Sequence, residues 1–299
     1  MAAVDAGEEA TPATRARRRV DPLCVLGLVI VGVVAILAVI GPSIGAYDPT
    51  LTTPDVSVPP PGLTELPGLV SAWLVGGPAP HFLGTDASGF DIFSRLMAAP
   101  RTDLVIALFA NGLSLVGGLL LGLLAGYFRN FVTELLMRAS DVLQSFPVFI
   151  SAMVLVALAG RSTANIVIAL AFVYTPIYIR LTRAEVLNQK NRGFIEAARA
   201  LGNREFTIAL RHVLPNSLKP ALIQWPVTIG FAILLTAGLS FVGAGVRPPT
   251  PEWGLMIASG ANEIIIGEWW SSVFPGIAIS ITVFGFAVLG DALERLYEA

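Results

Sequence analysis

The sequence predicts an all-α membrane protein with six transmembrane helices, and three observations lead to this fold class. Of the 299 residues, 55% are hydrophobic and only 13% are charged, whereas soluble domains carry about 25% charged residues. The mean hydropathy is +0.74. Several apolar runs approach ~20 residues, the length that an α-helix needs to cross a hydrocarbon core of ~30 Å.

Six apolar runs are read as spans. The first is longer than the apolar core of a signal peptide, which is usually ~7–15 residues, so a retained helix is expected. Pro147 and Pro176 fall in the third and fourth runs and are expected to kink them, because proline lacks the amide donor that a helix uses. The predicted spans are residues 23–40, 103–127, 133–159, 165–181, 222–246 and 272–290.

The remaining segments define the domain organisation. Residues 1–20 are polar and are expected to form a disordered cytoplasmic tail. Residues 21–101 are expected to hold the first transmembrane helix and then a proline-rich extracytoplasmic segment of extended chain, which includes Pro59, Pro60 and Pro61. Residues 102–292 are expected to form a five-helix core, followed by a short tail at 293–299.

The distribution of basic residues predicts the orientation. Six spans place both termini on the same side of the membrane. If that side is the cytoplasm, only four of the 19 Lys and Arg residues fall in outer segments, which is a strong positive-inside bias. Cytoplasmic N- and C-termini are therefore expected. The four outer residues are Arg95, Arg101, Arg161 and Arg247.

Several kinds of chemistry are not expected. No lysine follows a glycine, so the phosphate-binding loop of P-loop ATPases is missing, and no hydrolase motif appears. The chain is therefore expected to be neither an enzyme nor the holder of a cofactor. Cys24 is the single cysteine and His81 and His212 are the two histidines, so no metal site is expected.

The energy source for any transport is expected to lie outside the chain. The middles of the six predicted spans lack Asp, Glu, Lys, Arg and His, whereas ion-coupled carriers usually keep such groups at membrane depth. An ion-coupled carrier or channel without an ATPase remains the alternative from a different class. A membrane scaffold is a third possibility.

The polar segment 182–219 predicts two short helices. The first has an apolar stripe at helical spacing, and Gly202 is expected to end it in the left-handed conformation. Pro215 is expected to end the second helix. Alanines in the first stripe favour docking to a protein, with helices lying on the membrane surface as the alternative. The two stripes are Phe194, Ala197, Ala198 and Leu201, then Phe206, Ala209, Leu210 and Val213.

Other residues receive structural interpretations. Gly118, Gly122 and Gly126 share one helix face and are expected to let another helix approach closely. Trp269 and Trp270 are expected to anchor the chain at the membrane interface. Glu263 and Glu268 are expected to be solvated charges.

Four stretches together resemble one family. Glu196-Ala197-Ala198, with Gly202 and then Leu214-Pro215, resembles the EAA signature of ABC importer permeases. The other stretches resemble the C-type transmembrane subunit of the dipeptide/oligopeptide/nickel transporters within that family. They are Leu83-Gly84-Thr85-Asp86 with Gly89 and Asp91; Asp141 with Phe146-Pro147; and residues 240–246 with 248–254.

The resemblance implies a type I ABC importer permease fold in a bacterial-type cytoplasmic membrane. It implies coupling helices at 193–214 that dock in a groove of an ATPase subunit. It also implies an extracytoplasmic gate or a contact with a solute-binding protein. The implied coupling residues are Phe194, Glu196, Ala197, Ala198, Leu201, Gly202, Leu214 and Pro215, and the implied outer residues are Asp86, Asp91, Pro251, Glu252 and Trp253.

The partners that the resemblance implies are a homologous second permease subunit, two nucleotide-binding (ATPase) subunits and an extracytoplasmic solute-binding protein, in a lipid bilayer and without nucleic acid. ATP-Mg is expected on the ATPase subunits and not on this chain. Di- or oligopeptides are the expected cargo, with nickel complexes or haem-like ligands as alternatives.

Overall fold

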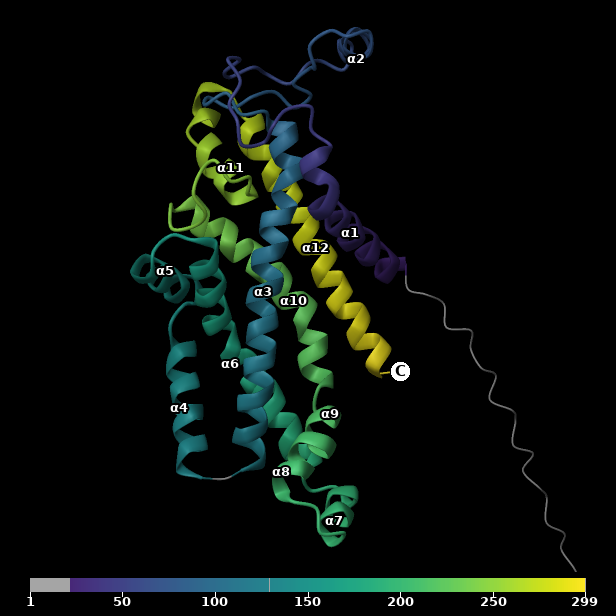
Figure 1. Ribbon diagram of the computed structural model, residues 1–299, viewed down its shortest axis with the longest axis vertical. Helices are drawn as coiled ribbons and strands as arrows, with labels where there is room; N and C mark the ends of the chain where they lie inside the picture. Colours follow the sequence, from purple (N-terminus) through teal and green to yellow (C-terminus); the bar gives the residue numbers. More distant parts are fainter. Residues whose placement is uncertain (1–21, 129, 299) are drawn as a thin grey trace, which may run out of the picture.

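The computed structural model describes residues 22–128 and 130–298, so the expected tail at 1–20 lies outside the described part. The fold is an elongated helical bundle with short helices gathered at its two ends (Figure 1). The long helices are α1 (Pro22–Ile40), α3 (Ile92–Tyr127), α4 (Phe131–Ser145), α5 (Val148–Ala159), α6 (Thr163–Gln189), α10 (Lys219–Phe241) and α12 (Trp270–Glu298). The short ones are η1 (Gly41–Ser43), α2 (Leu66–Leu74), α7 (Gly193–Ala200), α8 (Glu205–Ile208), the π-helical turn η2 (Ala209–Val213), α9 (Leu214–Asn216), α11 (Trp253–Gly260) and η3 (Glu263–Ile266).

Five of the helices are each long and apolar enough to cross a membrane: α1, α3, α6, α10 and α12. The third predicted span is instead divided into α4 and α5, whose axes meet at 98°. The break falls at Phe146-Pro147, where proline removes an amide donor and disfavours helical geometry for the residue before it. Six spans result only if this bent pair counts as one, and the expected kink at Pro147 is a full break.

Two helix boundaries differ from the predicted ones. α3 begins at Ile92, because the Asp91 carboxylate accepts a hydrogen bond from the Ser94 amide at 2.8 Å and caps the helix. The prediction of extended chain up to residue 101 is therefore wrong for this stretch, and also for α2. At its other end, α6 continues through Pro176 to Gln189, well past residue 181; a bend at Pro176 stays a prediction.

α3 and α6 form the centre of the bundle, and glycines set their separation. A Cβ atom at Gly118 would lie 2.2 Å from the Tyr178 Cβ, and one at Gly122 would lie 2.7 Å from the Thr182 Cβ. At Gly126 the nearest atom would be the Val186 Cγ1, at 2.7 Å. The predicted glycine face therefore receives α6 of the same chain, which agrees with the close approach that small residues allow in lipid.

A buried polar cluster joins three of the long helices. The Tyr178 hydroxyl of α6 lies 2.6 Å from the Thr228 hydroxyl of α10. The Asn111 amide of α3 donates to the Thr228 carbonyl at 3.3 Å. Because all three side chains are buried, these bonds satisfy groups that would otherwise be costly to remove from water.

Candidate functional site

The predicted coupling segment lies at one end of the bundle, opposite α2 (Figure 1). We call residues 190–218, which join α6 to α10, the α7 loop. α7 ends at Ala200. Two residues later, Gly202 has a φ of +80°, in the left-handed region. The Gly202 amide donates to the Arg199 carbonyl at 3.0 Å, and the Asn203 amide donates to the Ala198 carbonyl at 3.3 Å. These two bonds form a Schellman motif, so the predicted stop at Gly202 is confirmed.

The predicted apolar stripe of α7 is split between two faces. Ala198 is buried together with Ile195, which the stripe omitted. They pack in a cluster with Leu123 of α3, Val186 of α6 and Ile208 of α8. The adjacent face leaves three apolar residues in solvent: Phe194, which is 42% exposed, Leu201, which is 83% exposed, and Ala197.

The second predicted stripe is also split. Ala209 and Val213 are buried in the same cluster, whereas Phe206 is 60% exposed. α8, η2 and α9 form one uninterrupted helical run that ends at Asn216, one residue after Pro215. The predicted stop at Pro215 is therefore confirmed to within one residue.

The carboxylate of Glu205 links α8 to α7 and to the end of α3 through hydrogen bonds. Glu205, the first residue of α8, accepts the Arg199 Nε at 2.6 Å on one oxygen and the Arg199 Nη2 at 3.2 Å on the other. The hydroxyl of Tyr127, the last residue of α3, donates to the same carboxylate. These hydrogen bonds, from Arg199 first and then Tyr127, lower the pKa of Glu205 to about 2.

Glu196 takes no part in this arrangement. It is exposed, and among the described residues the ion pair of the loop joins Arg199 to Glu205. Glu205 lies three positions after the Gly202 stop, at the start of the second predicted helix, but nothing local indicates its contact with Tyr127.

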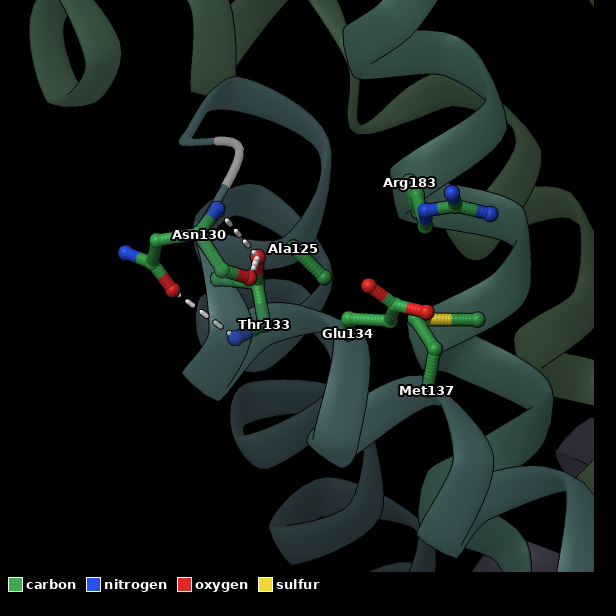
Figure 2. A pocket seen from close by; sticks show the side chains of 6 residues that line it. All are labelled: Ala125, Asn130, Thr133, Glu134, Met137 and Arg183. Carbon is green, nitrogen blue, oxygen red and sulfur yellow. Dashed lines mark hydrogen bonds between the residues drawn. The ribbon is translucent and has the colours of Figure 1, made fainter.

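Two cavities lie at this end of the bundle. One, of about 530 Å³, lies beside α7 and is lined by Tyr127, Glu196 and Glu205 among others. Figure 2 shows the other, of about 480 Å³, between α3, α4 and α6. Its Asn130 and Thr133 form the capping box of α4, and its Glu134 pairs with Arg138 at 2.7 Å. The polar groups of the second cavity thus serve mainly to start and brace α4.

The opposite end of the bundle is closed by residues 44–91 and 247–269, which we call the cap. Arg95, at the start of α3, is buried and joins both segments. Its guanidinium donates to the Pro49 carbonyl at 3.3 Å and to the Pro249 carbonyl at 3.2 Å. Its guanidinium carbon also lies 4.2 Å from the centre of the Phe90 ring.

The predicted outer residues Asp86 and Asp91 are buried in the cap and serve its internal structure. Asp86 accepts the Ser88 and Phe90 amides, both at 2.9 Å. Burial raises the pKa of Asp86 above its ordinary value. Asp91 caps α3 and lies 2.7 Å from the His81 ring. Neither side chain offers an exposed surface to a partner in this conformation.

Glu252 and Trp253 are likewise buried, and Pro251 is half-buried. The Glu252 carboxylate caps α11 by accepting the Gly254 and Leu255 amides at 2.8 and 2.7 Å. Burial raises the pKa of Glu252. The Trp253 indole donates to the Leu96 carbonyl of α3 at 3.2 Å, so Trp253 joins the cap to α3 in this conformation. A role of these residues in an extracytoplasmic gate stays a prediction.

Two further interpretations need correction. Trp270 is buried and donates to the Thr85 carbonyl at 3.0 Å, so it is not an interfacial anchor. Glu263 is also buried, and accepts the Ser271 hydroxyl at 2.7 Å and the Ala87 amide at 3.2 Å. Sequence reasoning also missed the buried Asp103 of α3, whose carboxylate accepts the Trp253 amide at 3.4 Å. In the described part of the chain, no three or more His, Cys, Asp or Glu side chains are placed to hold a metal ion.

Comparison with known proteins identifies the family. Residues 118–299 match the family described as binding-protein-dependent transport system inner membrane component. The di/tripeptide transport system permease protein DppC of Pseudomonas aeruginosa is 39% identical over 90% of this chain and 85% of its own length. The dipeptide transport system permease protein DppC of Escherichia coli is 40% identical over 90% of this chain and 86% of its own.

A third relative, the glutathione transport system permease protein GsiD of Pectobacterium atrosepticum, is 38% identical over 73% of this chain and 72% of its own length. The matches include the helices that carry the α7 loop, and those with the two DppC proteins extend over most of the chain. The chain therefore belongs to the family of binding-protein-dependent transport system inner membrane components and is a multi-pass permease of the inner membrane.

Proposed function

We propose that this chain is the C-type transmembrane subunit of an ATP-driven importer that carries di- or oligopeptides across the cytoplasmic membrane. Its relatives include permeases named for di/tripeptide, dipeptide and glutathione transport. In this proposal it pairs with a homologous permease, two ATPase subunits that bind ATP-Mg, and an extracytoplasmic solute-binding protein. In this proposal the chain forms part of the path of the peptide through the membrane, and ATP hydrolysis takes place on the ATPase subunits.

The observation that carries the proposal is the exposed face of α7. Phe194, Ala197 and Leu201 lie on this face, while Ile195 and Ala198 hold the helix against the ends of α3 and α6. A short helix with one anchored and one free apolar face suits helix-in-groove recognition. The groove is that of the ATPase subunit, with Glu196 at the rim of the contact.

The direction of coupling follows from charge. The α7 loop and its flanks hold Lys190, Arg192, Arg199, Arg204, Arg211 and Lys219, whereas residues 44–91 of the cap hold no Lys or Arg. This asymmetry supports a cytoplasmic position for α7, on the side where ATP is found. ATP binding closes the ATPase pair, and α7 moves with it. The permease then exchanges inward- and outward-facing states because ATP favours one of them.

The test replaces the exposed apolar face while leaving the anchored face intact. Phe194→Asp together with Leu201→Asp should abolish co-purification of the ATPase subunit and uptake of radiolabelled dialanine, because two charges would enter an apolar groove. Leu296→Asp is the matched control, since Leu296 is also an exposed leucine (59%) but belongs to α12. An importer that retains its ATPase with both α7 charges present, or a parent chain that purifies with no ATPase, would refute the proposal.

A further inference from the structure

Tyr127 and Glu205 are joined by a hydrogen bond, and the docking of the exposed α7 face does not require this contact. Tyr127 ends α3, Arg199 belongs to the last turn of α7, and Glu205 starts α8. We call these three residues the Glu205 junction. Their side chains meet at one carboxylate, which accepts two hydrogen bonds from Arg199 and one from Tyr127.

α3 connects the Glu205 junction with the cap. It is one continuous helix of 36 residues, about 54 Å long at 1.5 Å per residue. At its far end, Arg95 donates to the Pro249 carbonyl and the Leu96 carbonyl accepts the Trp253 indole. A displacement of α3 along or about its axis therefore reaches residues 249–253 directly.

We propose that Tyr127 and Glu205 are positioning residues that transmit the movement of α7 to the cap through α3. This rests on the proposed function, because it assumes that an ATPase moves α7. The chain already joins α7 to α6 and α10 covalently. The Glu205 junction adds a route that passes through side chains and ends at the loop before α11.

The Arg199–Glu205 ion pair contributes little to stability, and its main effect is to fix the orientation of the Glu205 carboxylate. Arg199 and Glu205 are both about half exposed, and ion pairs at the surface typically contribute only ~0–1 kcal/mol to stability. The two parallel Arg199 bonds fix the carboxylate in one orientation. The Tyr127 hydroxyl donates to the carboxylate held in this orientation. When α7 rotates and turns the carboxylate, the hydrogen bond therefore pulls on Tyr127 and so on the end of α3.

The Glu205 carboxylate remains a hydrogen-bond acceptor near neutral pH. The pKa of Glu205 is lowered to about 2 from an ordinary value of 4.5. A carboxylate with a lowered pKa contributes its stabilisation above its unfolded value and loses it only as the pH falls through the folded value. The carboxylate therefore stays ionised, and accepts both donors, throughout the range from pH 5 to pH 8.

The apolar surroundings keep the Glu205 junction in register. Tyr127 packs on the buried cluster that contains Leu123, Ile195 and Ile208. A second bond holds the end of α3 to the end of α6, because the Lys190 Nζ donates to the Gly126 carbonyl at 3.1 Å. The end of α3 is thus bonded to the residues that flank α7 in the sequence, Lys190 before it and Glu205 after it. These bonds limit how far α7 can move without moving α3.

The experiment uses the whole importer in proteoliposomes, with Tyr127→Phe and Glu205→Gln in this chain. Both variants should keep the ATPase subunit. The amount of dialanine moved per ATP hydrolysed should fall about fivefold, the lower end of typical coupling between sites. The double variant should be no worse than Glu205→Gln alone, since Tyr127 acts through Glu205. Glu134→Gln, which breaks an exposed pair within α4, is the control and should leave the ratio unchanged.

A second readout follows movement at the cap itself. Ser259 of α11 is exposed, so Ser259→Cys in a Cys24→Ser background can be labelled with a membrane-impermeant maleimide. Trapping the ATPases with ATP and vanadate should change the labelling rate in the parent but not in Tyr127→Phe or Glu205→Gln. A role confined to local structure would leave this response intact.

The possible outcomes separate the two proposals. An importer whose parent form contains no ATPase refutes the proposed function. With the ATPase present, four results overturn the transmission proposal alone: an unchanged transport ratio in both variants, loss of ATPase binding in both, labelling that ignores nucleotide in the parent, or labelling that still responds in the variants.

Discussion

At the residue scale, the end of α7 depends on the backbone freedom of Gly202. Its φ of +80° lies in the left-handed region, and an added Cβ would meet nothing within 4 Å. Gly202→Ala should therefore destabilise the α7 loop by about 1–2 kcal/mol through backbone strain alone. Hydrogen exchange at residues 195–205 would measure this as faster local opening.

Gly193 provides the matched control for Gly202. It also has open space around its Cβ position, but its φ is not in the left-handed region, so Gly193→Ala should leave exchange in the loop nearly unchanged. Equal effects of the two substitutions would show that the alanine side chain, and not the backbone of Gly202, is responsible.

Single residues also mark how far the sequence could be read. The stop at Gly202 was predictable, because a glycine after a helical stripe has a local cause. The anchoring role of Ile195 was not, since Phe194 and Ile195 are both apolar and only the position of α3 and α6 decides which one is buried. The partner of Arg199 was also hidden, because Glu196 and Glu205 both lie within reach of it along the chain.

At the element scale, the contact of α3 with α6 depends on the absence of side chains at the glycine face. Gly122→Ala would place a Cβ 2.7 Å from the Thr182 Cβ and 2.8 Å from the Ile179 carbonyl oxygen. The helices must separate to accept it, at a typical cost of ~1–3 kcal/mol for overpacking. Thermal unfolding of the purified protein should show a lower midpoint temperature.

Gly117→Ala tests whether the position, and not the substitution itself, matters. Its Cβ would come no closer than 3.9 Å to Thr175, so its midpoint should stay at or above that of the parent. If Gly117→Ala and Gly122→Ala lowered the midpoint equally, the packing explanation would fail.

The elements also show why boundaries were harder to predict than helices. The apolar runs of α10 and α12 are long and uninterrupted, so their lengths alone indicated spans. The span predicted at 103–127 began too late, because α3 starts at Ile92, where the Asp91 cap fixes its first turn. The break between α4 and α5 was indicated by Pro147, but its size of 98° is set by packing in three dimensions.

At the scale of the whole molecule, the two ends differ in how much could be predicted. The α7 loop is one continuous segment, so its pattern could be read locally. The cap is assembled from segments far apart in the chain, for example through Arg95 and Pro249, which are 154 positions apart. No local pattern predicts such a pairing, so the sequence did not indicate that Asp86, Asp91, Glu252 and Trp253 are buried inside the cap.

The orientation of the molecule in the membrane gives the last prediction. Residues 44–91 contain no Lys or Arg, whereas the α7 loop holds one Lys and four Arg, and basic segments remain in the cytoplasm during insertion. In a Cys24→Ser background, Leu63→Cys in the cap and Leu296→Cys in α12 place thiols at residues that are 87% and 59% exposed. In spheroplasts, an impermeant maleimide should label only Leu63→Cys, and after permeabilisation it should label both. Labelling of Leu296→Cys in sealed spheroplasts would put the C-terminus outside. Because α12 leads from the cap to the C-terminus and α3 leads from the cap to the end that carries α7, α7 would then also lie outside, away from any cytoplasmic ATPase.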